Sequence, residues 1–371
     1  MMDDRLIFTP DDVDLSRSPL RAGIAAPTYV LGAFNPGFTR LANGNLLMMV
    51  RIAEALREPV RDGMIRAIRW TAAGYVLDAW PLDAVDVTDP RQFALKGRAQ
   101  RILGLTSLSW LLPVELDPTG QTIVAVHYDA AIEPAATYQD YGVEDARISR
   151  IGDAWYMTTC SVSAERHSTT LHRSHDGLHY ELLGIVLDHQ NKDMLLFEGL
   201  VAGRFMALTR PLGECYFAYP PGSAFVGGPS INFAASPDAL HWRPLEAPGL
   251  RARKGSTSAM KIGGGSPPIL TAAGWLTIWH GVEARASVGV YRSFWALMDR
   301  DDPTRFLHVA DDAPLIEADP ALTAGIAHQL YLPTPVVFTT GMVDAGDHYL
   351  VASGEADLAC RLTRIDKARF A

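Results

Sequence analysis

Arg173-Ser-His-Asp-Gly-Leu-His-Tyr180 and Ala235-Ser-Pro-Asp-Ala-Leu-His-Trp242 share the pattern Ser-x-Asp-x-Leu-His-aromatic. The pattern is typical of a tight turn between two strands, in which the Asp side chain bonds to its own turn and the aromatic ring packs beneath it. Such turns recur once per blade in β-propellers, and at roughly 60 to 75 residues per blade the chain accommodates five blades. The alternative is two unrelated turns, and in either case these motifs are structural.

The rest of the chain favours antiparallel β structure, because short apolar runs alternate with turn residues and long amphipathic helical patterns are scarce. The clearest runs are Leu41–Val50, Thr122–Tyr128, Phe205–Thr209 and Trp275–Trp279. Residues 81–112 and 311–330 have weaker strand signals. No Pro- or Gly-rich linker divides the sequence, so we expect residues 1–371 to form one all-β domain, a five-bladed β-propeller.

Composition excludes several classes of protein. Hydrophobic residues make up 48% of the 371 residues and charged residues 20%, as in a globular protein with a large core. The net charge of -9 argues against a nucleic-acid surface. Cys160, Cys215 and Cys360 are odd in number and widely separated, which favours a reducing compartment. Neither a leader peptide nor a membrane span is predicted, so a cytoplasmic location is expected.

An acidic pair precedes one apolar strand. Tyr141-Gly-Val-Glu-Asp-Ala-Arg-Ile-Ser149 carries Glu144, Asp145 and Arg147 just before the strand expected at 151–159. In an extended segment Asp145 and Arg147 point to the same face, so the simplest interpretation is a structural salt bridge. A catalytic carboxylate is the alternative.

Elsewhere the sequence offers no metal-spaced cluster, no Gly-rich phosphate loop and no nucleophile elbow. Polar side chains do recur at the ends of the expected strands, and each taken singly is more typical of a surface group than of a site. They are Asn35, Arg51, Arg57, Asp145, Lys192, Asp193, Arg210, Lys261, His280 and Asp357.

Taken together, these segments resemble glycoside hydrolase family 130, the β-mannoside phosphorylases and β-mannosidases built on a five-bladed propeller. The resemblance extends from Gly32 to about Asp357. It rests on the order and spacing of Gly32–Pro36, Leu46–Arg51, Glu144–Arg147, Asn191–Phe197, Ala207–Pro211, Lys261–Pro268, Trp275–Val282 and Ser353–Asp357.

The resemblance implies a role for each matched residue. Asp145 falls on the family's general acid, which relays its proton through a sugar hydroxyl. Four positions match sugar ligands: Asn35, Arg51, Arg57 and Asp357. Four match the basic residues that hold inorganic phosphate: Lys192, Arg210, Lys261 and His280. The expected partners are a β-mannoside oligosaccharide and phosphate as co-substrate, with no other cofactor and no metal, and a homo-oligomer is possible.

Two departures from the family pattern affect the choice of reaction. Ala146 replaces a proline in the acidic motif, and Leu196-Phe-Glu-Gly-Leu200 loses a basic residue and gains Glu198. An inverting hydrolase needs a second carboxylate, roughly 6.5 to 9.5 Å from the acid, to activate water. A phosphorylase needs cations around a nucleophile that is already charged.

The four basic positions favour inverting phosphorolysis of β-mannosides. The alternative is an inverting β-1,2-mannosidase in which Glu198 or Glu144 is the base. A third hypothesis is a non-catalytic carbohydrate-binding propeller with Trp155 or Trp279 as platforms, which would not need Asp145.

Overall fold

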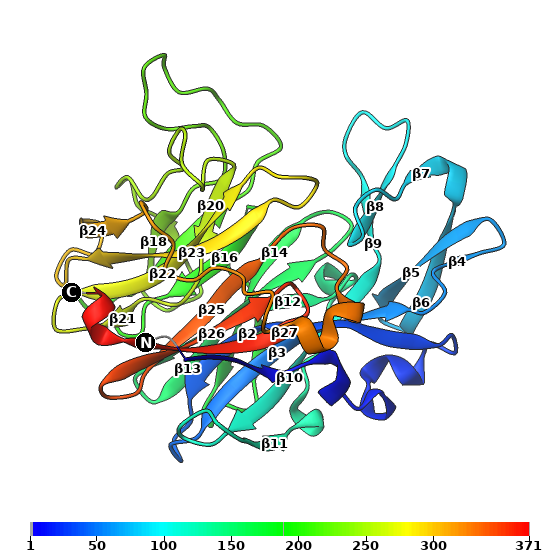
Figure 1. The fold of residues 1–371 in the computed structure, drawn as a ribbon, viewed down its shortest axis with the longest axis horizontal. Coiled ribbons are helices and arrows are strands. Elements are labelled where there is room, and N and C mark those ends of the chain that lie inside the picture. Colours follow the sequence, from blue (N-terminus) through cyan, green and yellow to red (C-terminus); the bar gives the residue numbers. More distant parts are fainter. Residues whose placement is uncertain (1–2, 188, 371) are drawn as a thin grey trace.

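The computed structural model describes residues 3–187 and 189–370, and in this part of the chain regular structure is almost entirely antiparallel strand (Figure 1). Five main sheets follow one another along the sequence. The first has the order β11-β10-β3-β2 and the second β12-β13-β14-β15. Their strands are β2 (Thr28–Arg40), β3 (Leu46–Leu56), β10 (Ser107–Leu116), β11 (Ile123–Val126), β12 (Val143–Ile151), β13 (Ala154–Val162), β14 (His167–Ser174) and β15 (Glu181–Ile185).

The third and fourth sheets have the orders β16-β17-β18-β19 and β20-β22-β23-β24, and β21 pairs with β22. Their strands are β16 (Asn191–Leu196), β17 (Phe205–Pro211), β18 (Asn232–Ser236), β19 (Arg243–Pro244), β20 (Lys261–Gly264), β21 (Ile269–Leu270), β22 (Trp275–Glu283), β23 (Val290–Met298) and β24 (Phe306–Ala310).

The fifth sheet joins the two ends of the chain, because β1 pairs with β27 in the order β1-β27-β26-β25. Two small sheets, β4-β5-β6 and β7-β8-β9, lie between β3 and β10 in the sequence. The strands are β1 (Asp3–Phe8), β25 (Val337–Asp344), β26 (His348–Glu355), β27 (Ala359–Asp366), β4 (Val60–Arg61), β5 (Met64–Thr71), β6 (Gly74–Pro81), β7 (Val85–Asp86), β8 (Gln92–Leu95) and β9 (Leu103–Leu105).

The helical segments of the described residues are short 3-10 turns. They are η1 (Pro10–Asp12), η2 (Leu15–Arg17), η3 (Pro19–Ala22), η4 (Leu82–Ala84), η5 (Tyr128–Ala130), η6 (Thr137–Gln139), η7 (Ala324–Gln329) and η8 (Lys367–Phe370). None of the described helices is long and apolar enough to cross a membrane.

The core consists of apolar layers between successive sheets. Met49 and Trp155 belong to a layer between the first and second sheets, and Leu171 and Met194 to one between the second and third. Further layers join the third sheet to the fourth, the fourth to the fifth, and the fifth back to the first. Each main sheet therefore packs on the next in chain order, and the last packs on the first.

The repeated Ser-x-Asp turns have the predicted chemistry. The Asp176 carboxylate accepts from the backbone nitrogens of Leu178 and His179, both at 2.8 Å. Asp238 accepts in the same way from Leu240 and His241, both at 2.9 Å. These turns join β14 to β15 and β18 to β19, the last two strands of their sheets. The prediction of structural turns between outer strands is confirmed.

Residues 81–112 contain more strand than expected. Trp110–Leu112 lie in β10, which pairs with both β3 and β11. Pro113 is also in β10, and a proline weakens the sequence signal of an interior strand because it has no N–H for the ladder. Residues 311–330 are mainly loop and the turn η7, as expected.

Candidate active site

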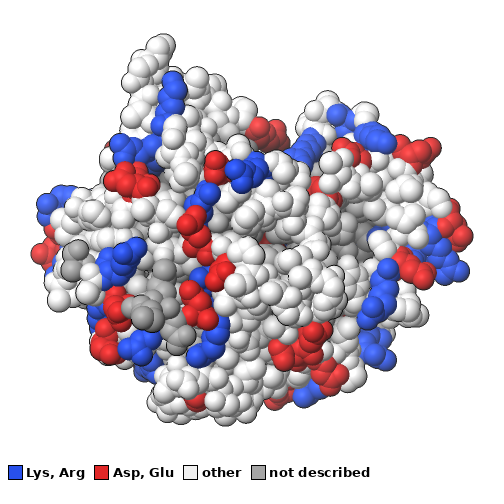
Figure 2. Space-filling view, viewed as in Figure 1, with Lys and Arg blue, Asp and Glu red and all other residues white. Residues whose placement is uncertain are grey.

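A cavity of about 460 Å³ receives side chains from all five main sheets. Its lining includes Asn35, Arg51, Glu144, Asp145, His167, Lys192, Asp193, Arg210, Lys261, His280, Tyr291, Phe338 and Asp357. The lining also includes Arg91 and Arg101 from the β7–β9 region, and Leu212 and Pro229 from the segment after β17. Figure 2 shows an indentation at the upper edge of the molecule, between protrusions that Figure 1 identifies as the β7–β9 region and the segment after β17.

Four lining residues have a left-handed backbone. The φ angles are 48° at Asn35, 51° at Asp145, 56° at Asp193 and 49° at Asp357. Asn and Asp tolerate this region better than other residues with a side chain. Three of these residues lie where the pairing register of β2, β12 or β16 shifts. A bulge re-aims side chains, so consecutive residues such as Glu144 and Asp145 can both face the cavity.

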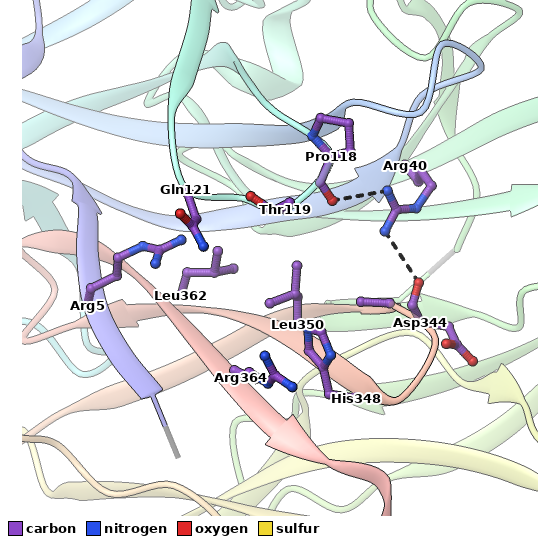
Figure 3. Close-up of a pocket in the computed structure, with 11 residues that line it drawn as sticks. Arg5, Arg40, Pro118, Thr119, Gln121, Asp344, His348, Leu350, Leu362 and Arg364 are labelled. Carbon is purple, nitrogen blue, oxygen red and sulfur yellow. Dashed lines mark hydrogen bonds between the residues drawn. The ribbon is translucent and has the colours of Figure 1, made fainter. Parts of the chain in front are cut away.

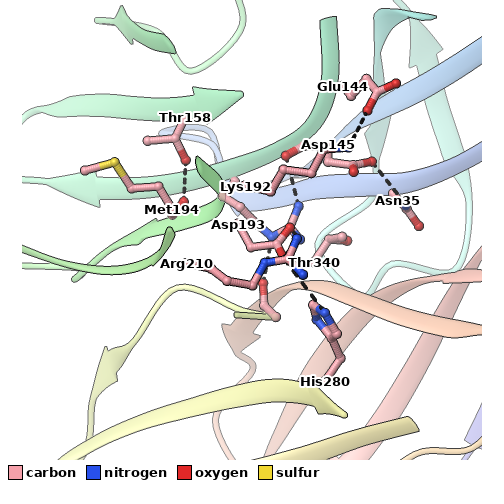
Figure 4. Close-up of polar contacts among 12 residues, drawn as sticks. Asn35, Glu144, Asp145, Thr158, Lys192, Asp193, Met194, Arg210, His280 and Thr340 are labelled. Atoms are coloured by element: carbon pink, nitrogen blue, oxygen red, sulfur yellow. Dashed lines mark hydrogen bonds and ion pairs between the residues drawn. The ribbon is translucent and has the colours of Figure 1, made fainter. Parts of the chain in front are cut away.

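The bulge also changes the partner of Asp145. The guanidinium of Arg147 donates to the backbone oxygens of Asp145, at 2.9 Å, and Gly265, at 2.8 Å, rather than to the Asp145 carboxylate. The carboxylate instead accepts from Asn35 Nδ2 at 3.0 Å (Figure 4). It also accepts from Arg51 Nη1 at 3.0 Å. The salt bridge between Asp145 and Arg147 that simple strand alternation suggested is therefore wrong.

Asp145 is held as a carboxylate. Burial alone would raise its pKa, but Arg51, Lys192 and Arg147 outweigh burial and hold the pKa well below its usual range. Glu144 also has a lowered pKa, because Arg51 and Lys192 offset its burial. Arg51 Nη2 lies 2.8 Å from Glu144, and Lys192 Nζ lies 3.2 Å from it. The carboxylates of Glu144 and Asp145 and the cations of Arg51 and Lys192 therefore form one connected network.

A second network surrounds Asp193, which is buried at the cavity wall (Figure 4). Its carboxylate lies 2.9 Å from Arg210 Nη2, 3.6 Å from Arg147 Nη2 and 3.8 Å from His280 Nε2. Burial lowers the pKa of His280 to about 3, so this imidazole is neutral. Among the described atoms, Arg210 Nε and both ring nitrogens of His280 are buried without a hydrogen-bond partner.

The cavity brings together nearly all of the predicted site residues. Asp145 lines the cavity together with three of the four predicted sugar ligands, Asn35, Arg51 and Asp357. The four predicted phosphate ligands, Lys192, Arg210, Lys261 and His280, are also in its lining. Arg57 is not among the lining residues and instead lines a neighbouring hollow with Tyr29.

Three details of the sequence interpretation need correction. Glu198 follows β16 at the end away from Lys192, is not in the cavity lining, and has a pKa raised to about 7 by burial. Trp155 and Trp279 are only 1% and 3% exposed, so they are core residues and not sugar platforms. The four predicted phosphate ligands also carry less net positive charge than their number suggests. Glu144 and Asp193 pair with Lys192 and Arg210, and His280 is neutral.

Sequence reasoning missed other cavity residues. Arg91 forms an ion pair with Asp89 at 2.9 Å and belongs to a segment with little strand signal. Arg91 also acts on the predicted residue Asp357: burial raises the pKa of Asp357 to about 6, although the charges of Arg91 and Arg51 oppose this rise. Tyr331 Oη donates to the backbone oxygen of Asp357 at 3.2 Å. No local pattern marks Arg91 or Tyr331, because each reaches the cavity from a loop.

Another hollow, of about 510 Å³, lies at the opposite ends of β2 and β25 (Figure 3). Arg5 and Arg40 line it and donate to backbone oxygens, including those of Gly120 and Pro118. Asp344, the carboxylate in its lining, forms an ion pair with Lys367 at 2.7 Å. His348 and Arg364, also in the lining, both pair with Asp347, whose side chain is 77% exposed, whereas the acids Glu144 and Asp193 of the first cavity are buried. In the described chain no group of three or more His, Cys, Asp or Glu residues is arranged to hold a metal ion.

Comparisons with known proteins identify the family of the chain. Residues 116–369 match the family model of glycoside hydrolase family 130, described as β-1,4-mannooligosaccharide phosphorylase. A β-1,2-mannobiose phosphorylase of Listeria innocua is 30% identical over 362 residues, which cover 95% of this chain and 91% of the relative. A β-1,4-mannooligosaccharide phosphorylase of Ruminococcus albus is 28% identical over 43% of this chain and 44% of the relative.

Solved structures show the same fold. The Listeria innocua β-1,2-mannobiose phosphorylase in complex with β-1,2-mannobiose has a TM-score of 0.77 and 26% identity, over 99% of this chain and 98% of the other. A second structure has a TM-score of 0.63 and 17% identity, over 98% and 95% of the two chains. It is described as a member of a mannoside phosphorylase family that contains hydrolases of β-1,2-mannosidic linkages in Candida mannan. The chain belongs to glycoside hydrolase family 130, the β-mannoside phosphorylase family.

Proposed function

We propose that the protein carries out inverting phosphorolysis of β-mannosides, releasing α-mannose 1-phosphate and a shortened sugar. The observation that carries this proposal is the cluster of Lys192, Arg210, Lys261 and His280 on one side of the cavity that contains Asp145. The phosphorylase relatives support the same reaction class. We place the reaction in a single domain.

We infer that this domain is a five-bladed β-propeller. The inference is supported by the cyclic packing of the five main sheets and by the shared sheet of β1 and β27, which would close the ring. All five sheets contribute to one cavity, as expected where propeller blades meet around a central channel.

The proposed phosphate site rests on unused donors. Arg210 Nε and the nitrogens of His280 are buried without partners, and Lys261 makes no ion pair within the described residues. Neutral His280 can donate one hydrogen bond to an oxyanion without adding charge repulsion. Lys261 and Arg210 supply charge-assisted bonds, which are about twice as strong as neutral ones. These donors would orient hydrogen phosphate as the nucleophile.

Asp145 is the proposed general acid. Its carboxylate is ionised in the free protein, so it must acquire a proton before it can protonate the leaving oxygen. Bound phosphate adds negative charge to the cavity, which raises the pKa of a nearby carboxyl. A phosphate oxygen forms the new bond to the anomeric carbon while the bond to the leaving oxygen breaks. The proton of hydrogen phosphate ends on the leaving sugar, with Asp145 and a sugar hydroxyl as the relay.

The alternative is an inverting β-1,2-mannosidase on the same fold. Glu198, which lies outside the cavity, is unsuitable as its base. Asp357 is the specific observation in its favour, since a pKa of about 6 suits a base that accepts a proton from water near neutral pH. Hydrolysis would leave the unused donors of Arg210, Lys261 and His280 without a reactant to bind, and for this reason we favour phosphorolysis.

Product analysis tests the proposal. The protein is incubated with β-1,2- and β-1,4-mannobiose, with and without phosphate, and the sugars are separated. We expect phosphate-dependent formation of mannose 1-phosphate. Arg210→Ala should raise the KM for phosphate by about ten- to a hundredfold, from the loss of a charge-assisted bond. The exposed Arg243→Ala is the matched control. Undiminished release of free mannose without phosphate would establish the hydrolase, and no turnover would favour a binding protein.

A further inference from the structure

A third hollow, of about 670 Å³, adjoins the catalytic cavity. Its walls are the N-terminal turns η1 and η2, the first residues of β2, and the segment His328–Tyr331. Leu31 and Tyr331 line both this hollow and the catalytic cavity, so the two lie side by side. In Figure 1, η7 (orange) lies next to the blue N-terminal turns that form the opposite wall. We name this hollow the distal groove.

The distal groove combines aromatic, apolar and polar surfaces. Tyr29 and Tyr331 supply two rings, and the Arg57 guanidinium lies 5.8 Å from the ring centroid of Tyr29. Leu15, Val30, Leu31 and Leu330 add apolar area, and Leu330 is 42% exposed. Asp11, His328 and Gln329 contribute polar edges.

This mixture fits an uncharged sugar better than other ligands. The C–H face of a pyranose packs on an aromatic ring, while its hydroxyls bond to groups such as guanidinium, imidazole and amide. Asp11 and Arg57 offset each other, so the groove has no net charge to select an anion or a cation. A purely apolar ligand would leave Arg57 and His328 desolvated without partners. The groove volume is within the range of about 300–1,000 Å³ that is typical of small-ligand sites.

Hydrogen bonds connect the two walls of the groove in the absence of a ligand. Gln329 Nε2 donates to both carboxylate oxygens of Asp11, at 3.1 and 3.0 Å, and so connects the two walls. Tyr128 Oη accepts from the backbone nitrogen of Asp14 at 2.6 Å, and Arg17 lies 4.5 Å from the Tyr128 ring centroid. A preformed groove spares the ligand the cost of ordering its site.

We propose that the distal groove is a binding site for the leaving-side units of β-mannosides longer than a disaccharide. The proposal rests on the proposed phosphorolysis, in which the unit transferred to phosphate is the terminal one. Every additional unit must then lie on the leaving side, and we assign that side to the distal groove, which borders the cavity at Leu31 and Tyr331. The N-terminal wall lies outside residues 116–369, so this specificity would belong to a part of the chain beyond the matched family region.

Chain-length kinetics test the proposal. In saturating phosphate, kcat/KM is measured for a di-, tri- and tetrasaccharide of one linkage. The wild-type protein should prefer the trisaccharide to the disaccharide. Tyr29→Ala and His328→Ala should each lower kcat/KM for the trisaccharide by about tenfold, the loss of about one good contact, and change the value for the disaccharide less than about twofold. Tyr29→Phe, which keeps the ring, should retain most of the preference. His241→Ala, on an exposed turn, is the control.

Equal losses on both substrates, or no loss on either, would overturn the distal site and leave the phosphorolysis intact. If no mannoside is turned over, the proposed function fails, and binding still decides the distal site. The trisaccharide is then titrated calorimetrically into Asp145→Asn and into the same variant with Tyr29→Ala. Affinity about tenfold weaker in the second protein would support the groove, and equal affinities would exclude it.

Discussion

The proposed acid, Asp145, is buried in the cavity and held ionised by Arg51, a state that ordinarily conflicts with donating a proton. The conflict is removed if Asp145 is a relay that acquires its proton only when phosphate and sugar are present. Its partners Asn35 and Arg51 fix the position of the carboxylate, so the proton path depends on geometry rather than on a raised pKa. At the scale of a single residue, the proposed role of Asp145 therefore rests on its position.

Asp145→Asn tests this role with little disturbance. Asparagine is nearly isosteric and tolerates the φ of 51°, so the fold and sugar binding should be retained. Loss of a positioned proton relay should lower kcat by about 10²- to 10⁴-fold. Steady-state kinetics and sugar titration measure the two effects separately. Activity within a few-fold of wild type would mean that another group is the acid.

Asp193 is predicted to stabilise the fold by compensating buried cations. Asp193→Asn removes the partner of Arg210 and the nearest carboxylate of Arg147, while asparagine fits the φ of 56°. Breaking a buried pair in this way should lower the free energy of unfolding by about 3–5 kcal/mol. Urea denaturation measures the change. The exposed Asp301→Asn carries the same charge change and should remain within about 0.5 kcal/mol of wild type. Similar stabilities for the two variants would exclude the compensating role.

Individual residues also mark the limit of prediction from sequence. Asp145, Arg51 and the four basic positions could be assigned because they occur in ordered motifs that resemble the family. Asp193 was visible as a polar residue at a strand end, but its pairing depends on Arg147 and Arg210, which come from other strands. Arg91 could not be found, because its segment has no recognisable strand pattern and reaches the cavity only through the folded chain.

At the scale of elements, the bulges in β2, β12 and β16 explain how so many polar side chains can face the cavity. Regular alternation would turn every second side chain of β12 away from the cavity, whereas the register shift between Glu144 and Arg147 presents Glu144 and Asp145 together. Sequence alternation could not reveal these shifts, although Asp or Asn at their centres is a weak signal for a left-handed backbone. The Ser-x-Asp turns were predictable because their hydrogen bonds are local.

The turn after β16 gives a pH-dependent prediction. Glu198 is partly buried and its pKa is raised from 4.5 to about 7, so its contribution to stability is present below about pH 4.5 and is lost as the pH rises through 7. Glu198→Gln removes this titration. The melting temperature of the variant relative to wild type should therefore be higher at pH 8.5 than at pH 5.

Thermal unfolding at the two pH values measures the difference, with the exposed Glu246→Gln as control. A constant offset between Glu198→Gln and wild type across this range would contradict the raised pKa. Because Glu198 lies outside the cavity, turnover should be preserved, and this separates the present structure from the expectation that Glu198 is a base for water.

At the scale of the whole molecule, the all-β class and the repetition of similar sheets follow from short apolar runs and repeated turns. The cyclic order of packing does not, because one apolar layer includes Phe38, Leu350 and Leu362, which are hundreds of positions apart in the sequence. Hydrogen bonds also connect neighbouring sheets. Thr340 Oγ1 donates to the backbone oxygen of Pro36 at 2.6 Å. Thr158 Oγ1 donates to the backbone oxygen of Met194, also at 2.6 Å (Figure 4). A ligand in the shared cavity therefore acts on several sheets at once.

The last prediction follows from this arrangement. Lys192 and Arg210 belong to the third sheet and Lys261 and His280 to the fourth, so phosphate bound among them would connect two sheets in the folded state only. A ligand at a hundred times its Kd stabilises the folded state by about 2.7 kcal/mol. Phosphate should accordingly raise the melting temperature of the wild-type protein and of Asp145→Asn, but raise that of Arg210→Ala much less. Chloride at equal ionic strength controls for general screening. An equal rise with chloride, or an undiminished rise in Arg210→Ala, would remove the phosphate site from these four residues and leave the sheet packing as described.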